Sequence, residues 1–228
     1  MKVSALKARS EDVAPLKAEA VLPLLEESVP DFKTELTYRN PFELVIATIL
    51  SAQCTDERVN RVTAALFAKY PDAASLAAAT QETLEEEIRS TGFYHDKTKR
   101  LLGCSRVLVE DFGGEVPRTL EELVSLPGVG RKTANLMLGE AFGQPAVVVD
   151  THVKRVSNRL EITSAQDADV IEVDLQKWLP RKDWWSGSSR LLLHGRYVCL
   201  AKKPRCGECV LREICPSAPV LLAKFAPS

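Results

Sequence analysis

The chain has 228 residues, with 30 Lys and Arg, 31 Asp and Glu, a formal net charge of −1 and six cysteines. A chain of this length buries a hydrophobic core without disulfide support, and no run of about 18 uncharged apolar residues indicates a membrane span. Charged side chains at Lys2, Lys7, Arg9 and Glu11 interrupt the N-terminus, so a secretory leader is not expected there. These features indicate a cytoplasmic protein whose thiols stay reduced.

Helical signals dominate the chain from Asn40 onward. Asn40, Pro41 and Glu43 supply a capping side chain, a first-turn proline and a third-position acid, which together predict a helix start. Apolar residues then recur at helical spacing: Phe42, Val45, Ile46, Ile49 and Leu50; Val59, Val62 and Leu66; Leu84 and Ile88; and Val153, Val156 and Leu160. The one β-type run, residues 147–149, is too short to build a sheet. We predict an all-α fold, with poorly anchored ends at residues 1 to about 18 and 217–228.

A glycine-containing turn follows the capping box of Thr119 and Glu122. It reads Leu-Pro-Gly-Val-Gly-Arg-Lys over residues 126–132. Gly128 and Gly130 allow backbone conformations that direct consecutive N–H groups outward at the start of the next helix, where the helix dipole also favours a phosphate. We interpret this segment as a helix-hairpin-helix motif that grips a nucleic-acid backbone and reads no sequence.

A tight interhelical turn is the alternative interpretation of the same glycines. An apolar residue between them and a basic residue directly after them favour backbone docking. The candidate DNA contacts of the hairpin are Gly128, Val129, Gly130 and Arg131. Residues 181–213 also hold eight basic and three acidic side chains, whereas acidic residues gather at 82–87. One face can thus be basic despite the net charge, or both runs can be ordinary solvated helix faces.

Lys132 stands in the first turn of the helix after the hairpin, where the helix dipole disfavours the ammonium form. A neutral amine is a nucleophile that can attack a sugar C1′ and hold the product as a Schiff base. Asp150 follows an apolar run and precedes Thr151 and His152, which places it at a helix start as a candidate carboxylate partner. The plainer alternatives are a phosphate-binding lysine and a helix-capping aspartate.

Four cysteines near the C-terminus are separated by six, two and five residues, a spacing that suits four thiolates around one metal centre: Cys199, Cys206, Cys209 and Cys215. A disulfide framework is the competing interpretation, but it does not suit a reducing compartment. Spacing alone does not choose between zinc and an iron–sulfur cluster, because a two-residue gap is common to both. Only Cys54 and Cys104 lie outside this group.

The segments Leu-Pro-Gly-Val-Gly-Arg-Lys-Thr-Ala and Val-Asp-Thr-His, together with the four cysteines, resemble the endonuclease III family, the DNA glycosylases and AP lyases of base-excision repair. The resemblance extends from about residue 20 to Cys215. It implies a six-helix barrel with a helix-hairpin-helix motif over residues 34–144. Residues 1–33 and 145–228 are then expected to form a discontinuous iron–sulfur cluster lobe, with DNA bound in the groove between the two lobes.

The resemblance also implies a reaction. The family removes oxidised pyrimidines from duplex DNA and cleaves the strand by β-elimination through a lysine Schiff base. Lys132 and Asp150 match the nucleophile and the carboxylate, and the four cysteines match the ligands of a [4Fe–4S] cluster. We accordingly expect a monomer whose partner is double-stranded DNA with oxidised pyrimidines or abasic sites, acting at the nucleoid if the source is bacterial.

Further site residues follow from the same resemblance. A flipped nucleotide leaves a gap in the duplex, and the family fills it with side chains matching Gln53 and Phe93, where leucine is usual in place of Phe93. His152 matches a third residue lining the site. Ser51 and Asp56 are expected to border the base pocket, although Asp56 also suits a helix N-cap. The alternatives are a packed turn aromatic for Phe93 and a helix C-terminal amide for Gln53.

Two competing functions remain at this stage. A mismatch adenine glycosylase shares the expected fold and cluster, but that class lacks a lysine at the position of Lys132 and carries a further C-terminal domain, whereas 13 residues follow Cys215 here. A non-catalytic helix-hairpin-helix iron–sulfur protein that only binds DNA is the other. The presence of both Lys132 and Asp150 argues against it, because a protein that only binds needs neither.

Overall fold

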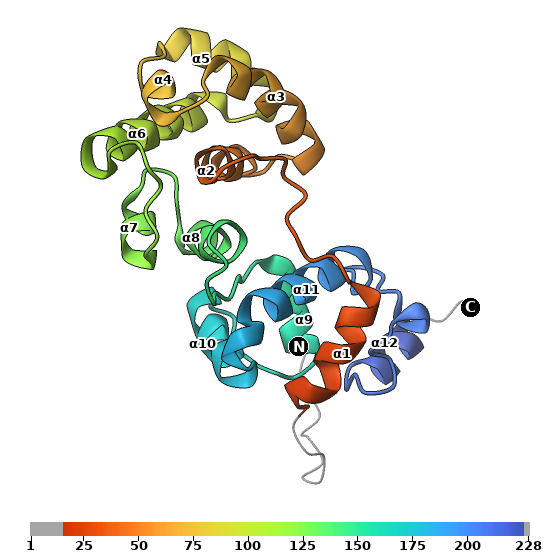
Figure 1. Ribbon diagram of the computed structural model, residues 1–228. Helices are drawn as coiled ribbons and strands as arrows, with labels where there is room; N and C mark the ends of the chain where they lie inside the picture. The colour runs from red at the N-terminus through yellow and green to blue at the C-terminus, as the bar shows by residue number, and fades with distance from the viewer. Residues whose placement is uncertain (1–15, 226–228) are drawn as a thin grey trace, which may run out of the picture.

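The computed structural model describes residues 16–225, in which helices are joined by short turns and no strand occurs (Figure 1). The α-helices are α1 (Ala18–Ser28), α2 (Pro41–Leu50), α3 (Asp56–Lys69), α4 (Ala73–Ala77), α5 (Gln81–Ile88), α6 (Tyr94–Phe112), α7 (Leu120–Ser125), α8 (Arg131–Leu136), α9 (Thr151–Arg159), α10 (Ala168–Trp178), α11 (Trp184–Tyr197) and α12 (Ala218–Lys224). Shorter 3₁₀ or π segments are η1 (Arg89–Thr91), η2 (Met137–Ala141), η3 (Arg181–Asp183) and η4 (Cys206–Glu208). The predicted all-α fold is confirmed.

The helices are divided between two lobes (Figure 1). Helices α2 to α8 form the barrel lobe, and α1 joins α9 to α12 in the C-terminal lobe. Each lobe has its own hydrophobic core: one extends from Leu36 to Ala146, and the other joins Val21 and Leu25 to apolar residues of the segment 147–211. Because α1 packs against α11, the N-terminal helix completes the core of the C-terminal lobe. The predicted two-lobed architecture is therefore confirmed.

Helix α2 forms as the sequence predicts and is buried along its whole length. The side-chain oxygen of Asn40 accepts a 2.9 Å hydrogen bond from the backbone N–H of Glu43, and Pro41 occupies the first turn. Leu44, Ile46 and Leu50 are completely buried, so truncating one of them to alanine would cost about 2–5 kcal/mol. This packing fixes the position of the turn that follows the helix, which carries Ser51 and Gln53.

The lobes approach each other closely at Gly139 of η2. A Cβ atom at this position would lie 2.2 Å from the ring of Trp185 in α11, so only glycine permits the contact. The extended segment 147–149 then runs into the C-terminal lobe, where the backbone N–H of Val148 donates to the hydroxyl of Ser188. As predicted, this β-type run forms no sheet. It instead delivers Asp150 to the start of α9.

The predicted poor anchoring of the C-terminal end is wrong for residues 217–225. Ser217 donates a 2.8 Å hydrogen bond to the carbonyl of Arg159, and Ala218 is buried at the start of α12. The sequence offers little indication of this helix, because α12 is short and is held by contacts with residues distant in the chain. The same expectation is wrong for residues 16–18, because the Trp178 indole donates to the carbonyl of Leu16 and Ala18 is buried. For residues 1–15 and 226–228 it lies outside the described residues. No helix between residues 16 and 225 combines the length and the apolar character needed to cross a membrane.

Candidate active site

A cavity of about 490 Å³ lies where the two lobes meet. This volume falls in the range of small-ligand sites, roughly 300–1,000 Å³. One wall comes from the barrel lobe and includes Ser51, Asp56 and Lys132, and the other comes from the C-terminal lobe and includes Val148 and Arg196. The segment between α1 and α2 covers part of the same cavity. Three residues predicted from the sequence, Ser51, Asp56 and Lys132, are thus brought together although they lie far apart in the chain.

Lys132 is the second residue of α8 and its side chain is exposed on the cavity wall. Within residues 16–225 its amine has no hydrogen-bond or ion-pair partner. The neighbouring residues are held firmly: Ala134 and Asn135 are buried, and α8 continues directly into η2. A primary amine is therefore presented to the cavity from a fixed backbone, which is the arrangement that a lysine nucleophile requires.

The hairpin before α8 differs in detail from its predicted form. Gly128 has a φ of +86°, and a Cβ there would lie 3.0 Å from the side chain of Arg100, so glycine is required. Gly130, with a φ of −92°, is an ordinary extended N-cap. Val129 buries its side chain and donates its N–H to the carbonyl of Leu126. The backbone N–H of Val129 is therefore occupied within the turn. The prediction that consecutive N–H groups of the hairpin point outward is wrong at this residue.

Arg131, predicted as a DNA contact, forms an ion pair inside the protein. Its guanidinium donates two 2.8 Å hydrogen bonds to the two carboxylate oxygens of Glu172 in α10. Glu172 is buried and also accepts from the amide of Asn135, and this pairing raises the pKa of Arg131. The guanidinium remains partly exposed, with Asp169 3.6 Å away. Sequence reasoning missed Glu172 because an isolated acid in an amphipathic helix carries no signal of its partner.

Asp150 is the N-cap of α9, as predicted. One carboxylate oxygen, Oδ1, accepts hydrogen bonds of 2.8 Å from the backbone N–H groups of both His152 and Val153. The carboxyl group is therefore fixed through one oxygen, which leaves the other available. Asp150 does not line the cavity that contains Lys132, although Val148, two residues earlier, does. The hydrogen bonds thus establish Asp150 as a helix cap. To act as a catalytic carboxylate as well, Asp150 would have to contact a part of the substrate that lies outside this cavity.

His152 lies half-buried in the first turn of α9. Its Nδ1 atom is 3.0 Å from the guanidinium of Arg155. A Cβ at Gly195 of α11 would lie 2.9 Å from the His152 side chain, so the close packing of α9 on α11 needs this glycine. The histidine ring is therefore held by contacts within the C-terminal lobe.

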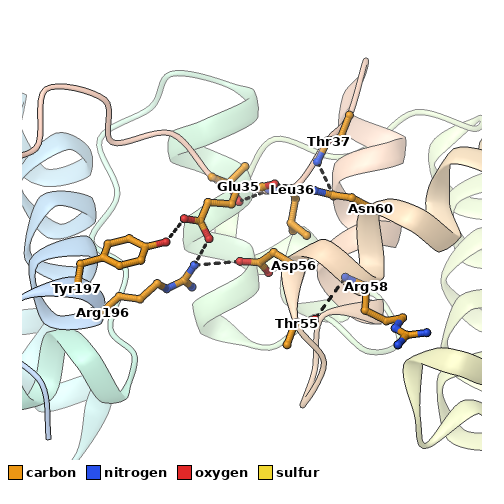
Figure 2. Close-up of polar contacts among 10 residues, drawn as sticks. Glu35, Leu36, Thr37, Thr55, Asp56, Arg58, Asn60, Arg196 and Tyr197 are labelled. Carbon is orange, nitrogen blue, oxygen red and sulfur yellow. Dashed lines mark hydrogen bonds and ion pairs between the residues drawn. The ribbon is translucent and has the colours of Figure 1, made fainter.

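Ser51 and Asp56 flank the turn between α2 and α3. Ser51 follows the last residue of α2 and donates to the carbonyl of Thr48. The expectation that Asp56 is a helix N-cap is wrong, because Thr55 caps α3 through its hydroxyl and Asp56 is the first helical residue. The Asp56 carboxylate points instead towards Arg196 (Figure 2).

An ion network around Arg196 joins the two lobes at the cavity (Figure 2). One guanidinium nitrogen, Nη1, donates to Glu35 at 2.6 Å and to Asp56 at 3.0 Å. Tyr197 also donates its hydroxyl proton to Glu35. This hydrogen bond, together with Arg196, holds the pKa of the Glu35 carboxyl below its usual value despite its partial burial. The network was missed from the sequence, where Arg196 was counted only as one member of a basic stretch.

Gln53 and Phe93 share a backbone feature that the sequence did not reveal. Both have a positive φ, +53° and +49°, a conformation that costs non-glycine residues of order 1–3 kcal/mol. Both side chains are exposed, Phe93 by 64%. The alternative of a packed turn aromatic is therefore wrong for Phe93. Buried Lys97 donates to the carbonyl of Thr91 and so fixes the turn that presents the ring.

The basic stretch at 181–213 is only partly available to a ligand. Arg190 is buried, donates to the carbonyl of Val29 and pairs with Glu26 in α1. Arg196 is committed to the network at the cavity. Exposed basic side chains remain at Arg181, Lys182, Lys202, Lys203, Arg205 and Arg212. The predicted basic face is thus smaller than the sequence count, and two of its arginines hold the fold together.

The four cysteines line one small cavity between α9, α11 and the C-terminal loop: Cys199, Cys206, Cys209 and Cys215. All are half-buried and none forms a disulfide. Burial raises the pKa of the Cys209 thiol to about 11, and the neighbouring thiolates add to this effect. Such mutual repulsion is relieved when a cationic metal centre binds deprotonated thiols. Arg159 donates to the Cys199 sulfur at 3.1 Å, a hydrogen bond that suits a ligating thiolate.

The donor set fits a cluster better than a single ion. Within the described part of the chain, no three His, Cys, Asp or Glu side chains converge closely enough to hold one metal ion. In a [4Fe–4S] cluster each thiolate binds a different iron, so the four sulfurs stand around a larger group. Such a cluster would link the loop that carries Lys202 and Lys203 to α9 and α11.

Comparison with known proteins agrees with this geometry. The family model for HhH-GPD superfamily base excision DNA repair proteins matches residues 46–181, and the model for the iron–sulfur binding domain of endonuclease III matches residues 199–215. The fold and site therefore define a base-excision repair protein of the helix-hairpin-helix class.

Individual relatives narrow this class. The chain is 53% identical to endonuclease III of Synechocystis sp. over 89% of this chain and 93% of the relative, and 49% identical to that of Bacillus subtilis over 86% and 90%. A solved structure of a non-covalent endonuclease III–DNA complex matches with a TM-score of 0.86 at 42% identity, covering 92% of this chain and 100% of that one. The chain belongs to the endonuclease III family. It is a DNA-binding enzyme, a DNA glycosylase with AP lyase activity, and it carries a [4Fe–4S] cluster.

Proposed function

We propose that this enzyme removes oxidised pyrimidines from duplex DNA and then cleaves the strand through a Schiff base on Lys132. The observation that carries the proposal is the position of Lys132 on the wall of a cavity of about 490 Å³. Its amine is exposed and has no partner among the described residues. The solved complexes that this chain resembles include a trapped covalent intermediate of endonuclease III with DNA. A covalent step through an amine suits that description.

The substrate must first leave the duplex. The sugar C1′ of a stacked nucleotide is shielded, so the damaged nucleotide rotates into the cavity between the lobes. Phe93 and Gln53 enter the space that it vacates, because both are exposed and are held in turns beside helix ends. The hairpin residues Gly128 and Gly130 offer backbone atoms to a phosphate. The buried side chain of Val129 holds these two glycines in place, and the ion pair of Arg131 with Glu172 fixes the residue that follows them.

The chemistry then proceeds at C1′. The Nζ atom of Lys132 attacks this carbon, the glycosidic bond breaks, and the base leaves with the bonding electrons and a proton. Loss of the amine proton and opening of the sugar ring give an imine between Nζ and C1′. Removal of a C2′ proton breaks the C3′–O bond and cuts the strand, and water then hydrolyses the imine to free Lys132.

Asp150 stabilises the positive charge that develops at C1′. Its Oδ1 atom is fixed by two backbone N–H groups, so the carboxylate meets the substrate without reorganising. His152, in the same helical turn, lines the DNA-facing side of this segment. Ser51 and Asp56, both in the cavity lining, border the space for the extruded base.

The [4Fe–4S] cluster supports DNA binding in this scheme and takes no part in bond cleavage. Its four cysteine ligands hold the loop that presents Lys202, Lys203 and Arg205, which are exposed and available to phosphates.

We also propose that the chain is divided into a barrel at residues 34–144 and a cluster lobe at residues 1–33 and 145–228. The enzyme acts as a monomer, in the cytoplasm at the nucleoid.

The lesion preference is tested by base release under single-turnover conditions. Duplexes carry thymine glycol, an unmodified thymine, or adenine opposite an oxidised guanine. We expect release of thymine glycol alone. Release of the mismatched adenine would instead assign the activity of an adenine glycosylase, and binding without release from any duplex would favour the purely binding function.

A further inference from the structure

Arg196 occupies a position that the reaction scheme does not explain. It lies at the C-terminal end of α11 in the C-terminal lobe, yet it binds Asp56 of the barrel lobe, 140 residues away in sequence, and Glu35 of the connecting segment, 161 residues away (Figure 2). All three residues line the cavity that contains Lys132. The arginine therefore joins the lobes at the place where a nucleotide would enter.

The two sides of the cavity are held by separate contacts. Lys132 follows Arg131, whose bidentate pair with Glu172 fixes α8 against α10. The side formed by Ser51 and Asp56 lies at the turn between α2 and α3, and the ion pair that joins this turn to the C-terminal lobe is made by Arg196. A change at Arg196 can thus shift the Asp56 side while the Arg131 contact still holds Lys132.

Electrostatics make Arg196 important at this point. The side chains of Arg196 and Asp56 are 33% and 23% exposed, so the pair is only partly screened by water. Glu35 and Asp56 both accept from the same Arg196 nitrogen, at 2.6 and 3.0 Å, so their carboxylates lie close together. Removing the guanidinium would leave two carboxylates facing each other in a half-buried site, and their repulsion would move the segments apart.

We propose that Arg196 is a positioning residue for base excision, which holds Asp56 and the α2–α3 turn against the extruded base. This inference rests on the proposed function and adds a requirement to it. Base excision needs the α2–α3 side of the cavity to fit the extruded base, because a misplacement of the reacting groups by about 1 Å can lower the rate by about a hundredfold. Cleavage at a pre-formed abasic site has no base to fit, so it depends on Lys132 and is spared when Arg196 is lost.

The test compares two substrates with two variants. Arg196→Met keeps the length of the side chain and removes the charge. Arg106→Met is the matched control, because Arg106 is an exposed arginine of α6 that does not line the cavity. Single-turnover rates on thymine-glycol and abasic duplexes are measured with iron content and thermal melting. We expect Arg196→Met to slow excision by about tenfold or more and to cleave abasic DNA nearly as the wild type does, with Arg106→Met unchanged on both.

A double substitution shows whether Arg196 acts through Asp56. If it does, Arg196→Met combined with Asp56→Asn should excise no more slowly than the slower single variant, because both remove one interaction. Losses that multiply would overturn the proposal, as would equal losses of excision and abasic cleavage in Arg196→Met.

Two further outcomes are also decisive. If Arg196→Met loses its cluster or melts early, Arg196→Lys replaces it, since an ammonium keeps the charge but not the guanidinium geometry. Partial loss of excision with intact abasic cleavage supports the proposal, and wild-type excision by this variant overturns it. A wild-type protein that cleaves abasic DNA but releases no thymine glycol would overturn the proposed lesion class, and this inference with it.

Discussion

Arg131 and Glu172 form a bidentate ion pair that links the hairpin before α8 to the C-terminal lobe. Two 2.8 Å hydrogen bonds join the guanidinium to the carboxylate, and Glu172 is only 3% exposed. Because Lys132 is the next residue, the pair fixes the start of the helix that carries the proposed nucleophile. An arginine that the sequence assigned to DNA is thus occupied within the protein, where it orders the backbone of the hairpin.

Replacing Glu172 with Gln should destabilise the protein and impair its reaction. The amide cannot accept from both guanidinium nitrogens, so we expect a loss of about 1–3 kcal/mol in the free energy of unfolding. Denaturant unfolding measures this change. Glu213→Gln is the control, because Glu213 pairs on the surface with its neighbour Arg212, and such pairs contribute about 0–1 kcal/mol. Equal effects of the two substitutions would show that the buried pair does not anchor the hairpin.

Asp150→Asn should separate catalysis from capping. The asparagine oxygen can still accept from the N–H groups of His152 and Val153, so melting should change little. The negative charge is lost, and we expect base excision to slow by about 10²–10³-fold. Thermal melting and single-turnover rates of the same preparations give both values. A fall in stability large enough to explain the rate would limit Asp150 to its capping role.

Phe93→Ala should lower excision from fully paired duplexes much more than cleavage at an abasic site, where unstacking is already easy. Melting should not fall much, because the ring is 64% exposed. Phe93→Leu should restore most of the activity. Phe93→Gly should be more stable than Phe93→Ala, since glycine removes the cost of a φ of +49°, of order 1–3 kcal/mol. Equal losses on the two substrates would contradict a wedge function.

Replacing any of the four cysteine ligands with serine should remove the cluster and destabilise the C-terminal lobe, because metal binding and folding are coupled. Iron analysis and the yellow-brown colour of the pure protein report the cluster. Cys54→Ser is the control for iron content, since Cys54 lies in the barrel lobe. A colourless, active protein with one zinc ion would contradict the assignment.

Local signals in the sequence predicted much of this structure. Helix caps at Asn40 and Asp150 depend on residues within three positions, and the cysteine spacing is also local. The pairing of Arg131 with Glu172 and of Arg196 with Asp56 joins residues 41 and 140 positions apart, so it becomes visible only when the lobes are assembled. Asp56 was misassigned for two reasons: Thr55, one residue earlier, is an equally good local cap and takes that position, and the partner of Asp56 lies in the other lobe.

The central claim is that the amine of Lys132 forms a covalent bond to the sugar. Borohydride reduces an imine to a stable amine, so it links protein to DNA only if a Schiff base forms. Wild-type protein, Lys132→Gln and Lys177→Gln, which changes an exposed lysine of α10, are incubated with an abasic duplex and borohydride. The account predicts cross-linking by the wild type and Lys177→Gln and none by Lys132→Gln, which should still bind the duplex. Cross-linking by Lys132→Gln at the wild-type level would contradict it.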